Sequence, residues 1–340
     1  MTLLIDKAPS KARLRNESGY SLLELLVSVA ILTIVSGTAL EGVFRLSKVS
    51  QTVSNRVEMH SGVRNATELL QQEVGQAGRI ALPHIVQLQN AVGIGSTPVA
   101  IKSVDAAGNT VSSANPTDSM FVGERLVVDA GTQVETTTVT AVDTSNKTFT
   151  ARFLMPHAAN AAVTVAGGFA YGVVPRHNAN GSTFTNGSTG SVMKVIGDIN
   201  SDGNLEYIEY SCDTGSGNLY RRTMSYNATS KPAISADMAL LNNITANPNN
   251  SDCFTYEERS VVGVPYVVDV AITLTVKTPD KDPVTGLYQT ETKALLNVSP
   301  RNVFNVWQLA SQGIPNRVQP DQLTVPSMLP GNVSTLIGLP

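Results

Sequence analysis

An apolar run that carries a single acidic side chain is the feature that most constrains the fold of this chain. Between Tyr20 and Leu40 every residue is apolar, aromatic or small except Glu24. A helix of this length, rising about 1.5 Å per residue, can cross a hydrocarbon core of about 30 Å. An ionised carboxylate in that core costs at least about 2.5–3.5 kcal/mol, so we expect Glu24 to have a cationic partner.

The residues before the apolar run form a short basic leader. They contain four cationic and two acidic side chains, a net charge of +2: Lys7, Lys11, Arg13, Arg15, Asp6 and Glu17. Such a charge is typical of the cytoplasmic side of a membrane, and the leader lacks the apolar core of a secretory signal. The run holds no Lys, Arg or His, so a cation at this depth requires an α-amino group released by cleavage before Tyr20. A plain N-terminal anchor and a conventional signal cleaved near Ala39 are the alternatives, and neither accounts for Glu24.

The segment Gly19-Tyr20-Ser21-Leu22-Leu23-Glu24, followed by a long apolar helix, resembles the N-terminus of type IV prepilins. The resemblance implies that a prepilin peptidase cuts after Gly19, that Tyr20 becomes N-methylated, and that Glu24 pairs with the new amine of a neighbouring subunit during assembly. Tyr20 stands where the family most often has Phe. The resemblance also implies a precursor in the inner membrane with its head in the periplasm, and a pilus at the cell surface after assembly with other major and minor pilins.

The helix is expected to extend from residue 20 to residue 78, with residues 20–40 in the membrane. Beyond the membrane segment, apolar residues recur at spacings of three and four, which is one stripe of an amphipathic helix. They are Leu46, Val49, Val53, Val57, Val63, Ala66, Leu70, Val74 and Ala77. No Pro interrupts this stretch, and Gly75 and Gly78 mark its end. We predict that the stripe over residues 46–77 packs against a head.

The rest of the chain is predicted to be almost entirely β-structure, giving an α+β fold. Residues 79–175 contain short Thr- and Val-rich strands with polar turns, typical of a small sandwich or barrel, and are predicted to form an inserted all-β module that acts as a spacer. Residues 176–310 are predicted to form an antiparallel β-sheet head, including a hairpin of residues 266–277 and 288–298. Residues 311–340 are rich in Pro and are predicted to be a flexible tail.

A calcium loop is predicted at Asp198–Glu209, which meets every position of the Asp-x-Asn-x-Asp-Gly-x5-Glu pattern. Hard cations take oxygen ligands, and the spacing offers side-chain oxygens, one backbone carbonyl and a closing carboxylate that binds with both oxygens. The expected ligands are Asp198, Asn200, Asp202, the carbonyl of Asn204, Glu206 through water, and Glu209. The flanking residues read as strands, so this would be an isolated loop. A metal-free Asn/Asp/Gly turn is the alternative.

The two cysteines, Cys212 and Cys253, belong to a chain whose leader sends it across a membrane, so we expect a disulfide between them. Two free thiols or half of a metal site are the alternatives. A C-terminal disulfide loop is also what the prepilin resemblance implies. The four histidines show no metal-ligand or triad spacing, and we predict no catalytic residues and no enzyme activity. Removing the leader changes the net charge from −3 to −5, which argues against a nucleic-acid partner.

Three functions are compatible with these features. The size, the acidic loop and the closing hairpin before Pro300 are similar to the PilW-type minor pilins, which implies a subunit that primes or caps a type IV pilus. A pseudopilin of a type II secretion system, similar to GspJ, would share the same N-terminus. A calcium-dependent adhesin anchored by its helix, with the inserted module as its binding surface, belongs to a different class. The three differ in whether the chain leaves the cell envelope in filaments.

Overall fold

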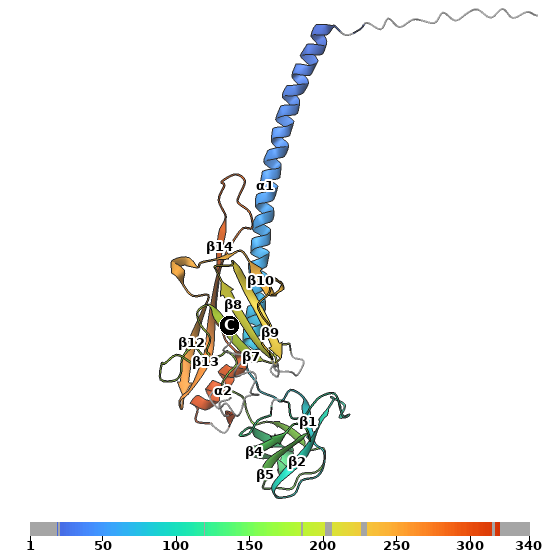
Figure 1. Cartoon of the computed structure of the whole chain (residues 1–340), viewed down its shortest axis with the longest axis vertical. Helices are drawn as coiled ribbons and strands as arrows, with labels where there is room; N and C mark the ends of the chain where they lie inside the picture. Colours follow the sequence, from blue (N-terminus) through green and yellow to red (C-terminus); the bar gives the residue numbers. More distant parts are fainter. Residues whose placement is uncertain are drawn as a thin grey trace, which may run out of the picture. The chain divides into compact units, whose positions relative to one another are not determined.

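The computed structural model describes residue 19 and residues 21–118, 120–184, 186–200, 206–225, 230–314 and 317–319. Among them, residues up to Ser54 with Asp282–Gly286 form one compact unit and the other described residues form a second. The second unit contains a closed β-barrel, and a head made of two antiparallel sheets with two helical segments packed on them (Figure 1). The predicted α+β class is therefore confirmed.

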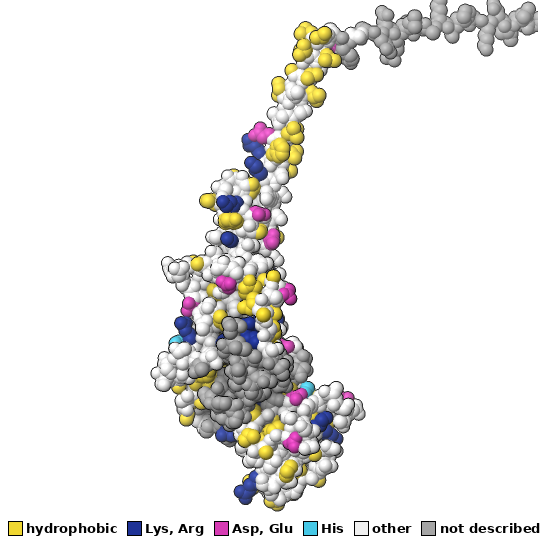
Figure 2. Space-filling model, in the orientation of Figure 1, with side chains coloured by type: hydrophobic (Ala, Val, Ile, Leu, Met, Phe, Trp, Pro, Cys, Tyr) yellow, Lys and Arg dark blue, Asp and Glu magenta, His cyan; other side chains and the backbone are white. Residues whose placement is uncertain are grey.

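The first helix, α1 (Leu22–Gln76), is uninterrupted. Its N-terminal part is long and apolar enough to cross a membrane, and its hydrophobic side chains are exposed, as Figure 2 shows. Toward its C-terminal end the helix enters the head, where its buried apolar residues are Met59, Val63, Ala66, Leu70 and Val74.

Only the second half of the predicted stripe is buried by the chain itself. Leu46, Val49, Val53 and Val57 are between 54% and 70% exposed. The prediction of core packing over residues 46–77 is therefore wrong for the first half of this range. The periodicity identifies the apolar face of a helix correctly, but it does not say what covers that face.

The inserted module is a closed barrel of six antiparallel strands in the order β1-β2-β5-β4-β3-β6. The strands are β1 (Ile85–Leu88), β2 (Gly95–Val104), β3 (Arg125–Val128), β4 (Glu135–Asp143), β5 (Thr148–Phe153) and β6 (Ala162–Val165), with a short 3-10 helix η1 (Gly131–Gln133) before β4. Alternate residues of these strands point inward and are buried, for example Leu88, Leu126, Phe149 and Phe153. The interior is a packed apolar core, because small barrels are filled by their own side chains.

The head contains two four-stranded sheets. The first has the order β10-β9-β8-β7 and the second has β13 at its centre, paired with β11, β12 and β14. The strands are β7 (Val192–Gly197), β8 (Glu206–Asp213), β9 (Asn218–Ser225), β10 (Ala239–Asn242), β11 (Ile244–Thr245), β12 (Phe254–Val261), β13 (Val264–Lys277) and β14 (Thr290–Val298). Short 3-10 helices η2 (Ala236–Met238) and η3 (Pro248–Asn250) lie in the connections. The hairpin predicted for residues 266–277 and 288–298 is the β13–β14 pair.

The C-terminal half of α1 and the inner faces of both sheets share one apolar core. A disulfide joins Cys212 of β8 to Cys253, the residue before β12. The predicted pairing is therefore confirmed, and the bond ties one sheet to the other beside this core.

A second helix that the sequence did not suggest, α2 (Arg301–Ser311), packs Val303 and Val306 on the second sheet. The predicted flexible tail, residues 311–340, begins inside this helix, and residues 317–319 are also fixed, whereas residues 315–316 and 320–340 lie outside the described residues. Val318 forms a parallel bridge with Gly168, and the buried side chain of Gln319 bonds to the backbone of Arg125 and Ala166. The chain is thus held against the barrel as far as Gln319.

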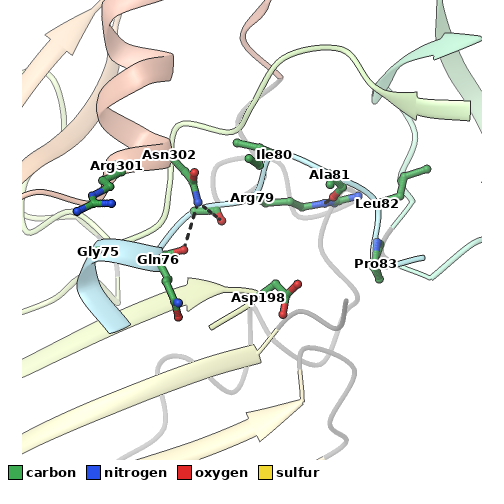
Figure 3. Close-up of a pocket in the computed structure, with 11 residues that line it drawn as sticks. Gly75, Gln76, Arg79, Ile80, Ala81, Leu82, Pro83, Asp198, Arg301 and Asn302 are labelled. Carbon is green, nitrogen blue, oxygen red and sulfur yellow. Dashed lines mark hydrogen bonds between the residues drawn. The ribbon is translucent and has the colours of Figure 1, made fainter. Parts of the chain in front are cut away.

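The chain enters and leaves the barrel at neighbouring points. After α1, the amide of Gly78 donates to the carbonyl of Ile196 on β7 (2.9 Å), and the amide of Phe169, after β6, donates to the carbonyl of Arg79 (3.1 Å). The side chain of Asn302 on α2 donates to the carbonyls of Gln76 and Gly78 (3.2 and 3.4 Å), which satisfies acceptors at the end of α1 (Figure 3).

Candidate functional site

The predicted cleavage bond lies directly before α1. The helix begins at Leu22, and Gly19 and Ser21 are exposed and outside it. Tyr20, predicted to carry the methyl group, lies outside the described residues. An ideal Cβ built on Gly19 meets no atom within 4 Å. Gly19, on one side of the predicted cleavage bond, is thus exposed and outside the helix, which suits access by a protease.

Ser21 and Glu24 form the N-terminal cap of the helix. The hydroxyl oxygen of Ser21 accepts a hydrogen bond from the backbone amide of Glu24 (3.2 Å), and its carbonyl accepts one from Leu25 (3.1 Å). Ser-x-x-Glu is the sequence of a capping box, and an acidic residue in the first turn is favoured by the helix dipole. Local capping therefore explains part of the Ser21-x-x-Glu24 pattern.

The carboxylate of Glu24 is exposed, and within the described part of the chain no Lys, Arg or His forms an ion pair with it. In water, an exposed carboxylate would need no cationic partner. In a helix apolar enough to span a membrane, the same carboxylate requires a cation from elsewhere. The arrangement is suited to pairing with a group on another molecule.

The described residues include only part of the predicted calcium loop. Asp198, Asn200 and Glu206 are described, and the amide of Asn200 lies 3.5 Å from a carboxylate oxygen of Glu206. Asp202 and Asn204 lie outside the described residues. Asp198 lines a pocket of about 440 Å³ together with the end of α1 and the start of α2 (Figure 3). The described residues contain no group of three or more His, Cys, Asp or Glu placed to hold a metal ion.

Glu209 has partners other than those predicted. Its two oxygens accept hydrogen bonds from Tyr207 (2.6 Å), Lys231 (3.0 Å) and Arg222, and the carboxylate is buried. Burial raises the pKa of Glu209, but these three hydrogen bonds outweigh it and lower the pKa overall. The sequence predicted that both oxygens bind calcium. In the structure they form ion pairs with two buried cations, Arg222 and Lys231.

The pleat of β8 explains this difference. Side chains alternate between the two faces of a strand. Ile208 and Tyr210 enter the core shared with α1, while Tyr207 belongs to the other apolar cluster and donates to Glu209. Glu206 therefore lies on the opposite face of β8 from Glu209. A calcium loop closed by Glu209 would require that carboxylate to leave Arg222 and Lys231, and so the described residues do not fit the predicted ligand set.

A second buried carboxylate, Glu73, fixes α1 to the first sheet. Its oxygens accept hydrogen bonds from Arg221 on β9 (2.6 and 3.0 Å) and from the hydroxyl of Tyr210 on β8. The apolar stripe predicted for this helix does not include Glu73. A signal was available, because Glu73 lies three residues after Leu70 and four before Ala77, within the register of the buried stripe.

A third buried ion pair joins the segment after α1 to the barrel. The guanidinium of Arg79 lies 2.8 Å from the carboxylate of Glu124 and 4.6 Å from the ring centre of Phe169. Both charged side chains are at most 2% exposed. Burial raises the pKa of Glu124 to about 7, although Arg79 opposes the rise.

The raised pKa of Glu124 predicts that its contribution to stability falls as the pH increases. Between pH 4.5 and about 7 the folded state binds this proton more tightly than the unfolded state, so the free energy of unfolding decreases through this window and levels off above it. Other carboxylates titrate in the same range, so the measured quantity is the difference between wild type and Glu124→Gln. Between pH 5 and 7.5 we expect the free energy of unfolding of the wild type, measured with denaturant, to fall by on the order of 1–3 kcal/mol relative to that of the variant. If the wild type instead became more stable relative to Glu124→Gln as the pH rises, the raised pKa of Glu124 would be contradicted.

Comparison with known proteins bears on the N-terminal segment. Residues 14–40 match the family model described as the prokaryotic N-terminal methylation motif. No curated protein and no solved structure matches the chain. The matched residues include Gly19, Tyr20 and Glu24 and the whole apolar run. The motif supports a type IV prepilin-like protein, a pilin or a pseudopilin, that is processed by a prepilin peptidase and anchored in a membrane by its N-terminal helix.

Proposed function

We propose that the protein is a minor pilin that primes or caps the assembly of a type IV pilus. The observation that carries the proposal is the N-terminal methylation motif on a helix whose Glu24 has no cation within the described chain. Cleavage after Gly19 would leave Tyr20 as the mature N-terminus. Its α-amino group, four residues before Glu24, would be the cation that a neighbouring subunit supplies.

The barrel favours a minor subunit over a shaft subunit. The subunits of a filament shaft pack closely together. Each copy in the shaft would therefore have to accommodate an additional closed barrel of six strands outside the head core. A subunit at the end of a filament, or present in few copies, meets no such restriction. The buried charged clusters of Glu73, Glu124 and Glu209 each hold two elements together, and we infer a structural rather than catalytic role for the chain.

Mass spectrometry of the mature N-terminus tests the processing step. We expect N-methylated Tyr20 as the first residue of the protein recovered from cells. A chain that still begins at Met1, or an unmodified Tyr20, would contradict the proposal.

Shearing of cells separates the pilus from the other two functions. A minor pilin is expected in the sheared filaments at a small fraction of the major subunit. A type II secretion pseudopilin, with the same N-terminal motif, would stay in the envelope, and an anchored adhesin would stay in the membrane without assembling. Recovery of the protein only in the envelope fraction would overturn the pilus assignment.

Calcium binding by the Asp198 loop stays a prediction of the sequence pattern, and melting of the protein with calcium or with a chelator measures it. Extracellular calcium sites have dissociation constants of about 10⁻⁴–10⁻³ M, so 10 mM calcium at about 10–100 times that value would raise the free energy of unfolding by about 1.4–2.7 kcal/mol. Asp202→Asn should remove the rise. Glu209→Ala is unsuitable as a test, because it breaks the ion pairs with Arg222 and Lys231 whether or not calcium binds. Equal melting in calcium and chelator would exclude the site.

A further inference from the structure

One end of the barrel is free of the head. The chain enters β1 and leaves β6 at the same end, because successive strands of the barrel run in opposite directions. The loops 89–94, 129–134 and 154–161 therefore lie together at the other end. They connect β1 to β2, β3 to β4, and β5 to β6.

His157 holds these three loops in place. Its imidazole is buried, with Nδ1 at 3.2 Å from Asp129 and Nε2 at 3.4 Å from Glu135, and its backbone exchanges two hydrogen bonds with Val92. Glu135 also accepts hydrogen bonds from the amides of Leu154 and Met155. The loop end is thus a fixed surface.

Three large aliphatic side chains are exposed on the outside of this surface, on three neighbouring strand ends. Ile94 is 73% exposed, Leu154 66% and Val134 46%. Gly95 pairs with Phe153, so Ile94 and Leu154 are opposite each other one position further along β2 and β5. Val134 comes directly before β4, the next strand. We name Ile94, Leu154 and Val134 the apolar row.

The loops around the apolar row carry little charge, and the barrel has no free strand edge. Two cations of the strands lie nearby: Arg152 is exposed on the outer face of β5 two residues before Leu154, and Lys102 donates a hydrogen bond to Asn160 (2.6 Å). The three loops contain no Lys, Arg or Glu, and their two ionisable residues, Asp129 and His157, bind each other. A closed barrel has no edge to which another strand could add. A partner must therefore lie across the outer side chains, and it should be mainly apolar, carry no cation of its own and be independent of backbone pairing.

We propose that the C-terminal segment Pro320–Pro340 of the same chain docks on the apolar row. Beyond Asp321 this segment has no charged residue, and its large apolar residues are Leu323, Val325, Met328, Leu329, Val333, Leu336, Ile337 and Leu339. Pro320, Pro326, Pro330 and Pro340 lack the amide that strand pairing needs. The composition of the segment therefore suits side-chain docking on a closed barrel.

The point where the described chain ends makes this docking geometrically accessible. Gln319 is bound to Arg125, the first residue of β3, and Arg125 is paired with Thr138 of β4. Val134 lies four residues along β4 from Thr138, about 14 Å at about 3.4 Å per residue, and one strand, about 5 Å, to the side. A chain spanning about 3.3 Å per residue covers this distance in about five residues, which brings Leu323 and Val325 to the row. The tether also supplies an effective concentration of about millimolar.

Photo-crosslinking of the full chain tests the proposal. The photoreactive residue p-benzoylphenylalanine is placed at Leu154 or, in a second variant, at Ile94, and products are read by mass spectrometry. Val262, which is 93% exposed at the turn between β12 and β13, is the matched control position. We expect about tenfold more cross-linking to Pro320–Pro340 from Leu154 than from Val262, and a comparable loss of that product with Leu323→Ser and Val325→Ser combined.

Mixing isotope-labelled and unlabelled chains distinguishes the possible occupants. Cross-links between the row and the C-terminal segment of the same chain support the proposal. Cross-links to another copy, to a lipid or detergent, or to another segment would overturn it. So would equal yields at Leu154 and Val262. None of these results depends on whether the protein assembles into pili.

Discussion

Replacing Glu73 by Ala should lower the free energy of unfolding of the head by about 3–5 kcal/mol. The substitution leaves the guanidinium of Arg221 half-buried without its carboxylate and the buried hydroxyl of Tyr210 without its acceptor. It also removes the polar contacts that hold α1 against β8 and β9. Denaturant unfolding followed by circular dichroism measures the change.

Glu68→Ala is the matched control for Glu73→Ala. Glu68 lies on the same helix and pairs with Arg64 at 2.7 Å, but both side chains are more than half exposed. Exposed pairs of this kind contribute little, because water and salt screen them. An equal loss of stability in the two variants would show that Glu73 acts through helix propensity and not through the buried ion pair.

Glu24→Gln should leave the protein in the membrane but reduce its recovery in sheared filaments by about tenfold or more, since each 1.4 kcal/mol of lost pairing is a factor of ten. A neutral amide is easier to insert into hydrocarbon than a carboxylate, so insertion should not suffer. The amide cannot form an ion pair with the amine of a neighbouring subunit. Quantitative blotting of the sheared and membrane fractions gives the ratio.

Glu41→Gln controls for the loss of any acidic residue from α1. Glu41 is exposed and pairs with Arg45 one helical turn away in the same chain, so it should not be required between subunits. Normal incorporation of Glu24→Gln, or equal defects in both variants, would remove the proposed role of Glu24 in assembly.

Features determined by neighbouring residues were predictable from the sequence. The apolar run gave the start of α1, and strict alternation from Tyr266 to Lys277 gave most of β13 and its hairpin partner. The prepilin-like segment around Glu24 was recognisable because leader charge, residue types and the apolar run occur together. These signals are local, so one sequence is sufficient to read them.

Features that depend on distant partners were not predictable. Closure of the barrel needs β6 to pair with both β1 and β3, and no local pattern specifies that. Helix α2 has β-branched and aromatic residues typical of strands, and its position against the second sheet decides its conformation. The cationic partners of Glu209 come from β9 and from the segment after it, so the calcium pattern alone could not reveal them.

The close approach of Arg79 and Phe169 has a consequence for how the chain can be divided. Their backbones are joined by a hydrogen bond of 3.1 Å, although the whole barrel lies between them in the sequence. A short peptide joining these two positions would replace the barrel without stretching the head, provided that Arg79, which would lose Glu124, is made neutral. The same head could therefore present other small domains grafted at this site.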